Sequence, residues 1–179
     1  MKRYILTGAP GSGKTSLLRH LEIDGFGIVE EAATDVIALQ QAQGVPEPWT
    51  RPSFLDAIVT LQRHREMRAA SESVEVQFHD RSVFCTAALA DYLGFRLSEL
   101  LKHELERVRA EKIFQCKVLF VRNLGFVSPT DQRRISYQES LRFEAIHERT
   151  YRDLGYELIF IEPGTLAERL LAIRHAIGS

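Results

Sequence analysis

The stretch TGAPGSGKTS, residues 7–16, lies between an apolar run and a helix-like segment. It fits the pattern G-x-x-x-x-G-K-[ST], with Gly8, Gly13, Lys14 and Thr15 at the defined positions. Glycines let the backbone turn tightly, so that successive N–H groups point at phosphate oxygens, and the following helix adds its positive N-terminal end. The stretch therefore predicts a strand, a phosphate-binding loop and a helix, in that order.

Each part of this loop has an expected task in binding ATP and Mg²⁺. Lys14 is expected to reach the β and γ phosphates, and the Thr15 hydroxyl is suited to Mg²⁺. The residues expected to surround the cofactor are Gly8, Ala9, Pro10, Gly11, Ser12, Gly13, Lys14, Thr15 and Ser16. The pattern does not distinguish ATP from GTP.

Beyond the loop, apolar runs alternate with helix-period segments, which is typical of βαβ units. Strands are expected at 3–8, 26–31, 74–80, 117–122 and 156–162. Helices are expected at 14–21, 32–42, 53–71, 83–93, 98–109, 136–154 and 166–177. The sequence therefore predicts one doubly wound α/β domain over residues 1–179, with a mainly parallel five-stranded sheet and helices on both faces.

Local signals refine these expectations. Ser53 followed by Asp56 is typical of a capping box, and Ser98 and Thr165 are expected to be N-caps. The segment 74–80 alternates apolar and polar residues, whereas a buried parallel strand is usually apolar on both faces. Partial exposure at the start of this strand is the expected reason.

Composition limits the classes of partner. The 23 basic and 24 acidic side chains leave a formal charge of −1, so no global field favours nucleic acid. Cys85 and Cys116 lie far apart in apolar contexts without a C-x-x-C neighbour, which predicts buried thiols. No run is long enough for a membrane span or a secretory leader, so we expect a cytoplasmic protein with no membrane partner. The oligomeric state is left open.

The motif HDRS, residues 79–82, ends the third predicted strand beside the phosphate loop. Asp80 is suited to hold Mg²⁺ or to accept a proton from an attacking hydroxyl. Arg81 is suited to neutralise charge as a γ-phosphoryl group moves. The alternative is a solvated ion pair at the strand end.

Glu30 and Glu31 end the second predicted strand, in IVEEAATDVI. Two carboxylates at this junction complement a helix dipole in one interpretation. In the other, Glu31 faces an acceptor molecule and orients or deprotonates its hydroxyl. The sequence leaves Glu31 and Asp80 as alternative bases.

An acceptor-side helical segment is expected at 32–73, and it includes the proline-rich stretch 43–53. Its Trp49 either stacks on an acceptor ring or covers the edge of the core. The long helix that follows carries polar side chains whose roles stay open: Gln62, Arg63, Arg65 and Arg68.

A lid is expected at 122–136, because a loop of about a dozen residues is long for a compact domain. Arg133 and Arg134 are suited to close over the phosphates as internal arginine fingers. A solvated basic turn is the alternative.

Taken together, GAPGSGKT, VEEAATDVI, HDRS, TDQRR and LGYELIFI resemble the AAA_28 group of predicted ATPases among P-loop proteins. That group is similar to the kinase domain that phosphorylates nicotinamide riboside and, more distantly, to deoxynucleoside kinases with their D/E-R-S motif. The resemblance implies a P-loop kinase fold. It implies the following site residues: Lys14 and Thr15 at nucleotide and metal, Glu31 at the acceptor, Asp80 and Arg81 at the reacting phosphate, and Arg133 or Arg134 in a lid. Thr34 and Gln132 stand where related sequences have Arg and Gly.

The sequence therefore favours a kinase that transfers the γ-phosphoryl group of ATP to the hydroxyl of a small, nucleoside-like acceptor. The alternative is an NTP-dependent regulatory ATPase whose lid is read by a partner protein.

Overall fold

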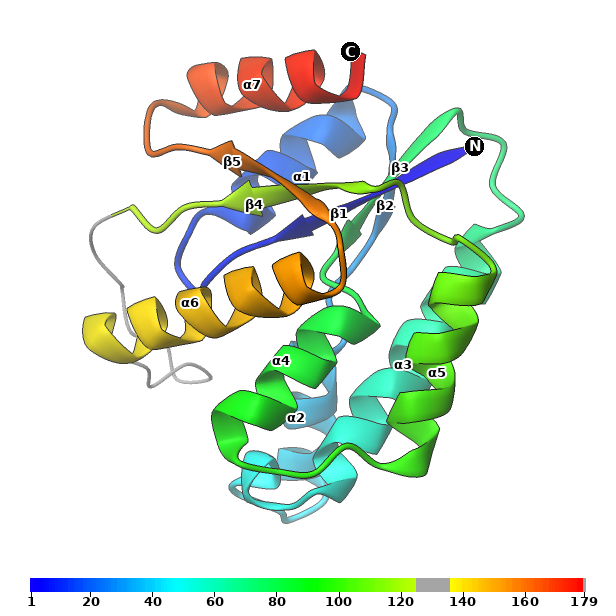
Figure 1. Ribbon diagram of the computed structural model, residues 1–179, viewed down its shortest axis with the longest axis vertical. Helices are drawn as coiled ribbons and strands as arrows, with labels where there is room; N and C mark the ends of the chain where they lie inside the picture. Colours follow the sequence, from blue (N-terminus) through cyan, green and yellow to red (C-terminus); the bar gives the residue numbers. More distant parts are fainter. Residues whose placement is uncertain (125–135, 179) are drawn as a thin grey trace.

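The structure is a computed structural model, which describes residues 1–124 and 136–178. Its five described strands form one sheet in the order β2-β3-β1-β4-β5, and all neighbours are parallel (Figure 1). The strands are β1 (Lys2–Thr7), β2 (Gly27–Val29), β3 (Val76–Asp80), β4 (Lys117–Val121) and β5 (Glu157–Ile161). The predicted α/β class and parallel five-stranded sheet are confirmed.

Helices cover both faces of this sheet (Figure 1). They are α1 (Lys14–Ile23), α2 (Ala33–Ala42), the 3₁₀ turn η1 (Pro48–Thr50), α3 (Ser53–Ala69), α4 (Val83–Leu93), α5 (Glu99–Ala110), α6 (Tyr137–Asp153) and α7 (Leu166–Gly178). One hydrophobic core joins the sheet to α1 and α7, and the other joins it to α2 to α6. Within the described residues, no helix has the length and apolar character needed to cross a membrane.

The central strand shows why the sheet is buried on both faces. Tyr4 and Leu6 of β1 belong to the core under α1 and α7, whereas Ile5 belongs to the core under α2 to α6. Ile5 and Leu6 have no exposed surface. Apolar residues in succession therefore fill both cores, as expected for a central parallel strand.

Strand β3 buries the polar residues that the alternating pattern made difficult to place. Gln77 and His79 are buried, and their side chains form a hydrogen bond of 2.9 Å. The Gln77 amide also donates to the carbonyl of Ala69, at 3.1 Å. The expected partial exposure occurs at the start of the predicted segment 74–80, where Glu75 is exposed and Val76 is half-buried. Mutual hydrogen bonding, rather than exposure, explains Gln77 and His79.

Two of the three predicted helix caps are confirmed. The Ser98 hydroxyl accepts a hydrogen bond from the first turn of α5, and Thr165 does the same for α7. The predicted capping box at Ser53 is wrong, because α3 starts at Ser53 itself, after Pro52, and no side chain caps it. Asp56 instead accepts a hydrogen bond from Ser98, so it ties the start of α3 to the start of α5.

The two cysteines differ. Cys85 is buried on α4, as predicted. Cys116 is exposed, so the prediction of a second buried thiol is wrong. It lies just before β4 begins. Its carbonyl accepts a hydrogen bond from the backbone N–H of Glu157, the first residue of the edge strand β5.

Candidate active site

The phosphate loop joins the carboxyl end of β1 to α1, at the edge where all the parallel strands end (Figure 1). Gly8 has φ of 137°, and a Cβ atom there would lie 2.2 Å from the carbonyl oxygen of Val121. Gly13 has φ of 82° and precedes the first residue of α1. Both backbone conformations favour glycine, so the sequence pattern follows from the shape of the loop.

The Lys14 side chain lies across this loop. Its ammonium group donates hydrogen bonds to the carbonyl oxygens of Gly8 at 3.1 Å and Ala9 at 2.9 Å. It also donates to the Ser12 hydroxyl at 3.3 Å, and the residue is 6% exposed. The lysine charge is thus held against the loop, at the position from which the motif predicts phosphate binding.

Thr15 and Ser16 are exposed in the first turn of α1. A hydroxyl at this position fits Mg²⁺, which in phosphate-transfer sites takes one or two protein oxygens together with phosphate oxygens and water. No group of three His, Cys, Asp or Glu side chains suited to a metal occurs among residues 1–124 and 136–178. The exposed Thr15 hydroxyl is a donor that suits a metal carried in with a nucleotide.

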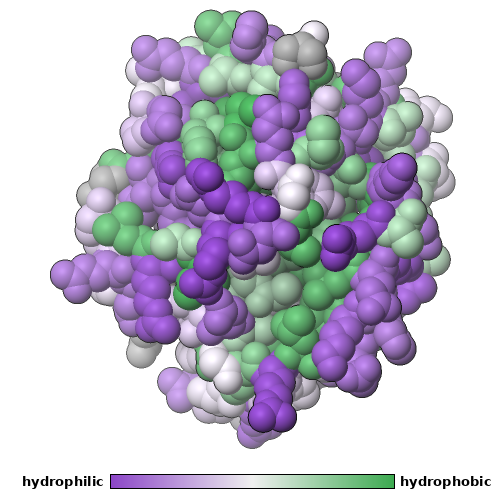
Figure 2. Space-filling model, in the orientation of Figure 1, coloured by the Kyte–Doolittle hydropathy of each residue, from purple (hydrophilic) through white to green (hydrophobic). Residues whose placement is uncertain are grey.

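A pocket of about 580 Å³ opens beside the loop, and Pro10 is part of its wall. Most of its apolar lining comes from α2, η1, α3 and α4, with Phe143 added from α6, and includes Ala33, Ile37, Trp49, Phe54, Ile58, Leu89 and Leu93. Figure 2 shows hydrophobic surface in the lower half of the molecule, where α4 and α5 lie, with hydrophilic side chains around it; of these two helices, only α4 lines the pocket. Apolar walls with a few convergent polar groups are typical of small-molecule sites.

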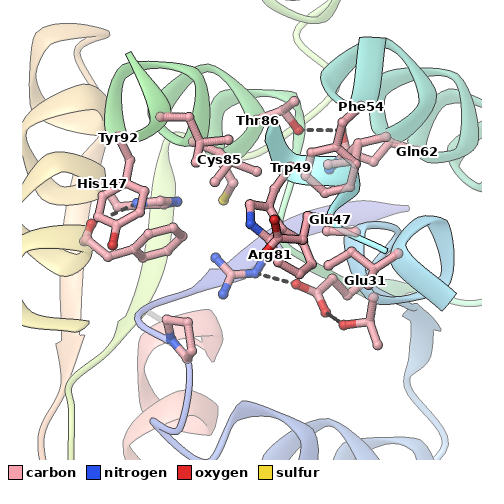
Figure 3. A pocket seen from close by; sticks show the side chains of 18 of the residues that line it. Glu31, Glu47, Trp49, Phe54, Gln62, Arg81, Cys85, Thr86, Tyr92 and His147 are labelled. Carbon is pink, nitrogen blue, oxygen red and sulfur yellow. Dashed lines mark hydrogen bonds and ion pairs between the residues drawn. The ribbon is translucent and has the colours of Figure 1, made fainter. Parts of the chain in front are cut away.

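Glu31 and Arg81 form an ion pair at this pocket, and both line it (Figure 3). The Arg81 Nε donates to Glu31 Oε1 at 2.8 Å, while Glu31 Oε2 accepts from the Thr34 hydroxyl at 2.6 Å. The Arg81 side chain is 8% exposed and the Glu31 side chain is 15% exposed. Arg81 Nη1 is buried and has no hydrogen-bond partner among the described residues. The structure thus brings together two of the predicted catalytic residues.

The backbone of Arg81 is strained, because its φ is 72°, in a region that residues with side chains rarely adopt. Its N–H donates to the carbonyl of Leu6 on β1, at 3.0 Å. The next residue, Ser82, caps α4 by accepting a hydrogen bond from Phe84 N–H at 3.3 Å. This sharp turn from β3 into α4 gives the arginine its place at the pocket, and such strain is found most often at functional sites.

Asp80 lies differently from Glu31. It is the last residue of β3, paired with Leu6 just before the phosphate loop. It is not among the residues that line the large pocket, but it borders a second cavity of only about 20 Å³. Of the two alternative bases, only Glu31 lines the pocket that has room for an acceptor.

Helix α3 contributes one polar group to the pocket. Gln62 lines it, and its side-chain oxygen accepts a hydrogen bond of 3.0 Å from Thr86 on α4. Arg63 points instead to Glu104, at 3.6 Å, and Arg68 is exposed. Trp49 both lines the pocket and packs on the core, so the two interpretations of this residue are compatible.

Arg65 of α3 supports the strand end that carries Glu31. It donates hydrogen bonds to the Glu31 carbonyl and, at 3.3 Å, to the Glu30 carbonyl. It also forms an ion pair with Asp35 on α2. Arg65 therefore fixes the junction between β2 and α2 without lining the pocket.

The first residue of the predicted lid has a structural role. Arg122 pairs with Glu144 at 2.9 Å and Glu148 at 2.8 Å, both on α6. Its guanidinium also lies 4.0 Å from the ring centre of Phe160. Gln132, Arg133 and Arg134 lie outside the described residues, so their predicted roles stay predictions.

Several pocket residues were missed at the level of sequence. On α6, His147 is buried and its Nδ1 donates to the carbonyl of Phe143 at 2.8 Å. On α4, Cys85, Thr86 and Tyr92 line the same pocket. The α4 residues could have been suspected, because their helix directly follows the HDRS motif. A single histidine such as His147 on an amphipathic helix gives no comparable indication in the sequence.

The known proteins most relevant to this geometry share its fold. The NadR protein in complex with NAD and AMP-PNP superposes with a TM-score of 0.70 at 17% identity, over 99% of this chain and 50% of NadR. NadR in complex with NR superposes with a TM-score of 0.71 at 15% identity, over 99% of this chain and 51% of NadR. The chain thus spans about half the length of NadR. Deoxyadenosine kinase from M. mycoides, with dCMP and dCDP, gives 0.63 at 11% identity, over 98% of both chains.

These identities are low, so the superpositions show a shared fold, that of P-loop kinases. No curated protein matches the sequence significantly. A family model, described as AAA domain, matches residues 3–169. That match extends from β1 to the first turn of α7 and includes every predicted site residue. The chain therefore belongs to the AAA_28 family of AAA domains.

Proposed function

We propose that this protein is an ATP-dependent kinase that phosphorylates a hydroxyl group of a small, nucleoside-like acceptor. The observation that carries the proposal is the ion pair of Glu31 and Arg81, which lines an apolar pocket next to the phosphate loop. A simple NTPase needs only a positioned water. A pocket of about 580 Å³ with a carboxylate at one end has room for a second substrate.

The nucleotide end of the site belongs to the loop and α1. Lys14 exchanges its hydrogen bonds with the loop oxygens for the β and γ phosphates of ATP, and the N-terminus of α1 adds its partial charge. Thr15 and Asp80 are the residues that would hold Mg²⁺. When bound, the metal supplies positive charge that offsets the phosphate charges.

The acceptor end belongs to Glu31 and Arg81. Glu31 takes the proton from the acceptor hydroxyl as its oxygen forms a bond to the γ phosphorus. The bond from that phosphorus to the bridging oxygen breaks at the same centre, and ADP leaves with the electron pair. Arg81 Nη1, which has no hydrogen-bond partner among residues 1–124 and 136–178, donates to the moving phosphoryl group.

The pocket walls support an acceptor with a flat ring. Trp49 and Phe54 offer aromatic surface, and the Gln62 amide projects among these apolar walls. Because Thr86 donates to the Gln62 oxygen, the Gln62 NH₂ is left to donate to an acceptor atom on the ring. The structural neighbours include NadR in complex with NR and a deoxyadenosine kinase with dCMP and dCDP, which supports a nucleoside-like acceptor.

The test is ATP turnover with nucleosides, nicotinamide riboside and nucleotides as acceptors. One class should raise turnover above the rate without acceptor, and Glu31→Gln should lower that rate by about 100-fold or more while nucleotide binding persists. Glu30→Gln is the matched control, because Glu30 is exposed and pairs with Arg19. Turnover that no acceptor raises would contradict the kinase proposal and favour the regulatory alternative.

A further inference from the structure

Arg169 is a buried arginine that lies against the phosphate loop, far from it in sequence. It belongs to the first turn of α7 and is 5% exposed. Its Nη2 donates a hydrogen bond of 2.7 Å to the carbonyl oxygen of Ser12. Within the described part of the chain, no carboxylate forms an ion pair with it, and its Nε has no hydrogen-bond partner. Burying a guanidinium without a counter-ion is costly, so its place calls for an explanation.

The position of this hydrogen bond determines the direction of one loop N–H group. The Ser12 carbonyl and the Gly13 N–H belong to the same peptide unit, which is trans. In a planar trans peptide these two groups point in opposite directions. Because Arg169 holds the carbonyl on its own side, the Gly13 N–H must point away from α7.

Gly13 makes this control necessary. Its φ of 82° and its lack of a side chain leave the preceding peptide unit free to rotate at little cost. A Cβ atom at Gly13 would also lie 2.9 Å from Arg169 Nη1, so the guanidinium occupies the space that the glycine leaves. The glycine and the arginine are therefore complementary: one permits the turn, and the other selects the direction of its peptide.

We propose that Arg169 is a positioning residue, which orients the Ser12–Gly13 peptide so that the Gly13 N–H is presented to the phosphates of a bound nucleotide. It acts through the loop and does not itself touch the substrate. This inference rests on the proposed nucleotide binding. Fixing the peptide before binding removes an ordering cost from the binding step.

The electrostatics agree with this role. Arg169, Lys14 and the N-terminus of α1 place three sources of positive charge around one loop. A triphosphate brings the opposite charge to the same place, so the energy of the buried guanidinium should fall when nucleotide binds. Nucleotide should consequently stabilise the wild-type protein more than a variant without this charge.

The test compares Arg169→Met and Arg169→Lys with the wild type, with Arg174→Met as the matched control. Arg174 is on the same helix, but it is half exposed and pairs with Asp24, the residue that follows α1. The probe is AMP-PNP with Mg²⁺, and its affinity is measured by calorimetry. A hydrogen bond from a charged group corresponds to about a 10- to 100-fold loss of affinity in Arg169→Met. Arg169→Lys should lose less, and Arg174→Met should bind as the wild type.

A spectroscopic signature separates this role from simple support of the fold. In ¹⁵N-glycine-labelled protein, AMP-PNP should shift the Gly13 amide resonance in the wild type and shift it much less in Arg169→Met. Millimolar methylguanidinium should restore part of the shift and affinity in Arg169→Ala. If Arg169→Met does not fold, Arg169→Lys with the same two measurements decides.

The outcomes can be told apart. Wild-type affinity and an unchanged Gly13 shift in Arg169→Met would overturn the role of Arg169 and leave the proposed kinase function standing. A wild-type protein that binds no AMP-PNP would overturn the proposed function and this inference together.

Discussion

Single residues determine the shape of the phosphate loop. Gly8 combines φ of 137° with a close approach to the last residue of β4. Any Cβ at this position would lie 2.2 Å from the Val121 carbonyl oxygen, and that oxygen belongs to the rigid backbone of the sheet. Gly8 is therefore needed both for its torsion angle and for its lack of a side chain.

We expect Gly8→Ala to destabilise the protein severely, or to displace the loop. A positive φ alone costs about 1–3 kcal/mol for a residue with a side chain, and the steric overlap adds to this cost. The measurement is the free energy of unfolding from chemical denaturation, together with AMP-PNP affinity. Gly25→Ala is the control, because Gly25 has φ of 90° but no atom lies within 4 Å of the place that its Cβ would take. Equal losses in the two variants would show that the Val121 contact does not matter.

At this scale the sequence indicated part of the site. The spacing of Gly8, Gly13 and Lys14 is specific to phosphate-binding loops, so Lys14 could be predicted from the pattern. Glu31 and Arg81 could be predicted because VEE and HDRS lie at the ends of predicted strands. Nothing in the pattern linked Glu31 to Arg81, because parallel pairing of β2 with β3 brings them together. Arg169 was not predictable, since 157 positions separate it from Ser12.

At the scale of elements, the charged cluster between α3 and α5 holds one wall of the site. Arg107 pairs with Glu66 at 3.0 Å and Glu104 at 2.6 Å. The two carboxylate side chains are 10% and 4% exposed. The hydrogen bond to Glu104 is the largest of the interactions that raise the pKa of Arg107 above its usual value. The same helix α3 carries Gln62 into the pocket.

We expect Arg107→Met to lower the free energy of unfolding by about 3 kcal/mol at pH 7, because the buried carboxylates of Glu66 and Glu104 lose their closest ion-pair partner and Glu104 keeps only the longer pair with Arg63, at 3.6 Å. Urea denaturation at pH 7 measures the effect. Arg149→Met is the control, because its pair with Asp91 is exposed on both sides and contributes little. A loss as small as that of Arg149→Met would show that the buried ion pairs do not stabilise the fold.

Elements were predicted better than their ends. In the described part of the chain, the five strands and seven α-helices lie within the expected ranges, apart from shifts of a few residues at their ends. Strand β2 is limited to Gly27–Val29. The two residues after it leave the sheet, and their side chains form ion pairs instead: Glu30 with Arg19, and Glu31 with Arg81. Asp56 is not part of a capping box, because α3 begins at Ser53 itself, and its carboxylate instead accepts a hydrogen bond from Ser98, which is distant in sequence. Tertiary contacts of this kind leave no local trace in a sequence.

The whole molecule buries two histidines in its interior. Burial lowers the pKa of His79 to about 3, and the charge of Arg3 adds to the effect. Burial likewise lowers the pKa of His147 to about 3, with smaller contributions from Arg81 and Lys14. Both rings are therefore neutral in the folded protein at any pH near neutrality. In the unfolded chain a histidine titrates near its ordinary value of about 6.5.

This difference fixes the sign of a pH effect on the stability of the whole fold. Between pH 6.5 and 3 the unfolded state binds more protons than the folded state, so the free energy of unfolding falls as the pH falls. Between pH 7 and pH 5, each histidine should lower the free energy of unfolding by about 2 kcal/mol, and the two together by about 4 kcal/mol. Urea denaturation across this range measures the slope.

His79→Gln should halve this slope, since a neutral amide remains beside Gln77. His103→Gln, at an exposed position on α5, should leave the slope unchanged. A wild-type stability that is flat from pH 7 to pH 5 would mean that the buried rings accept protons without unfolding.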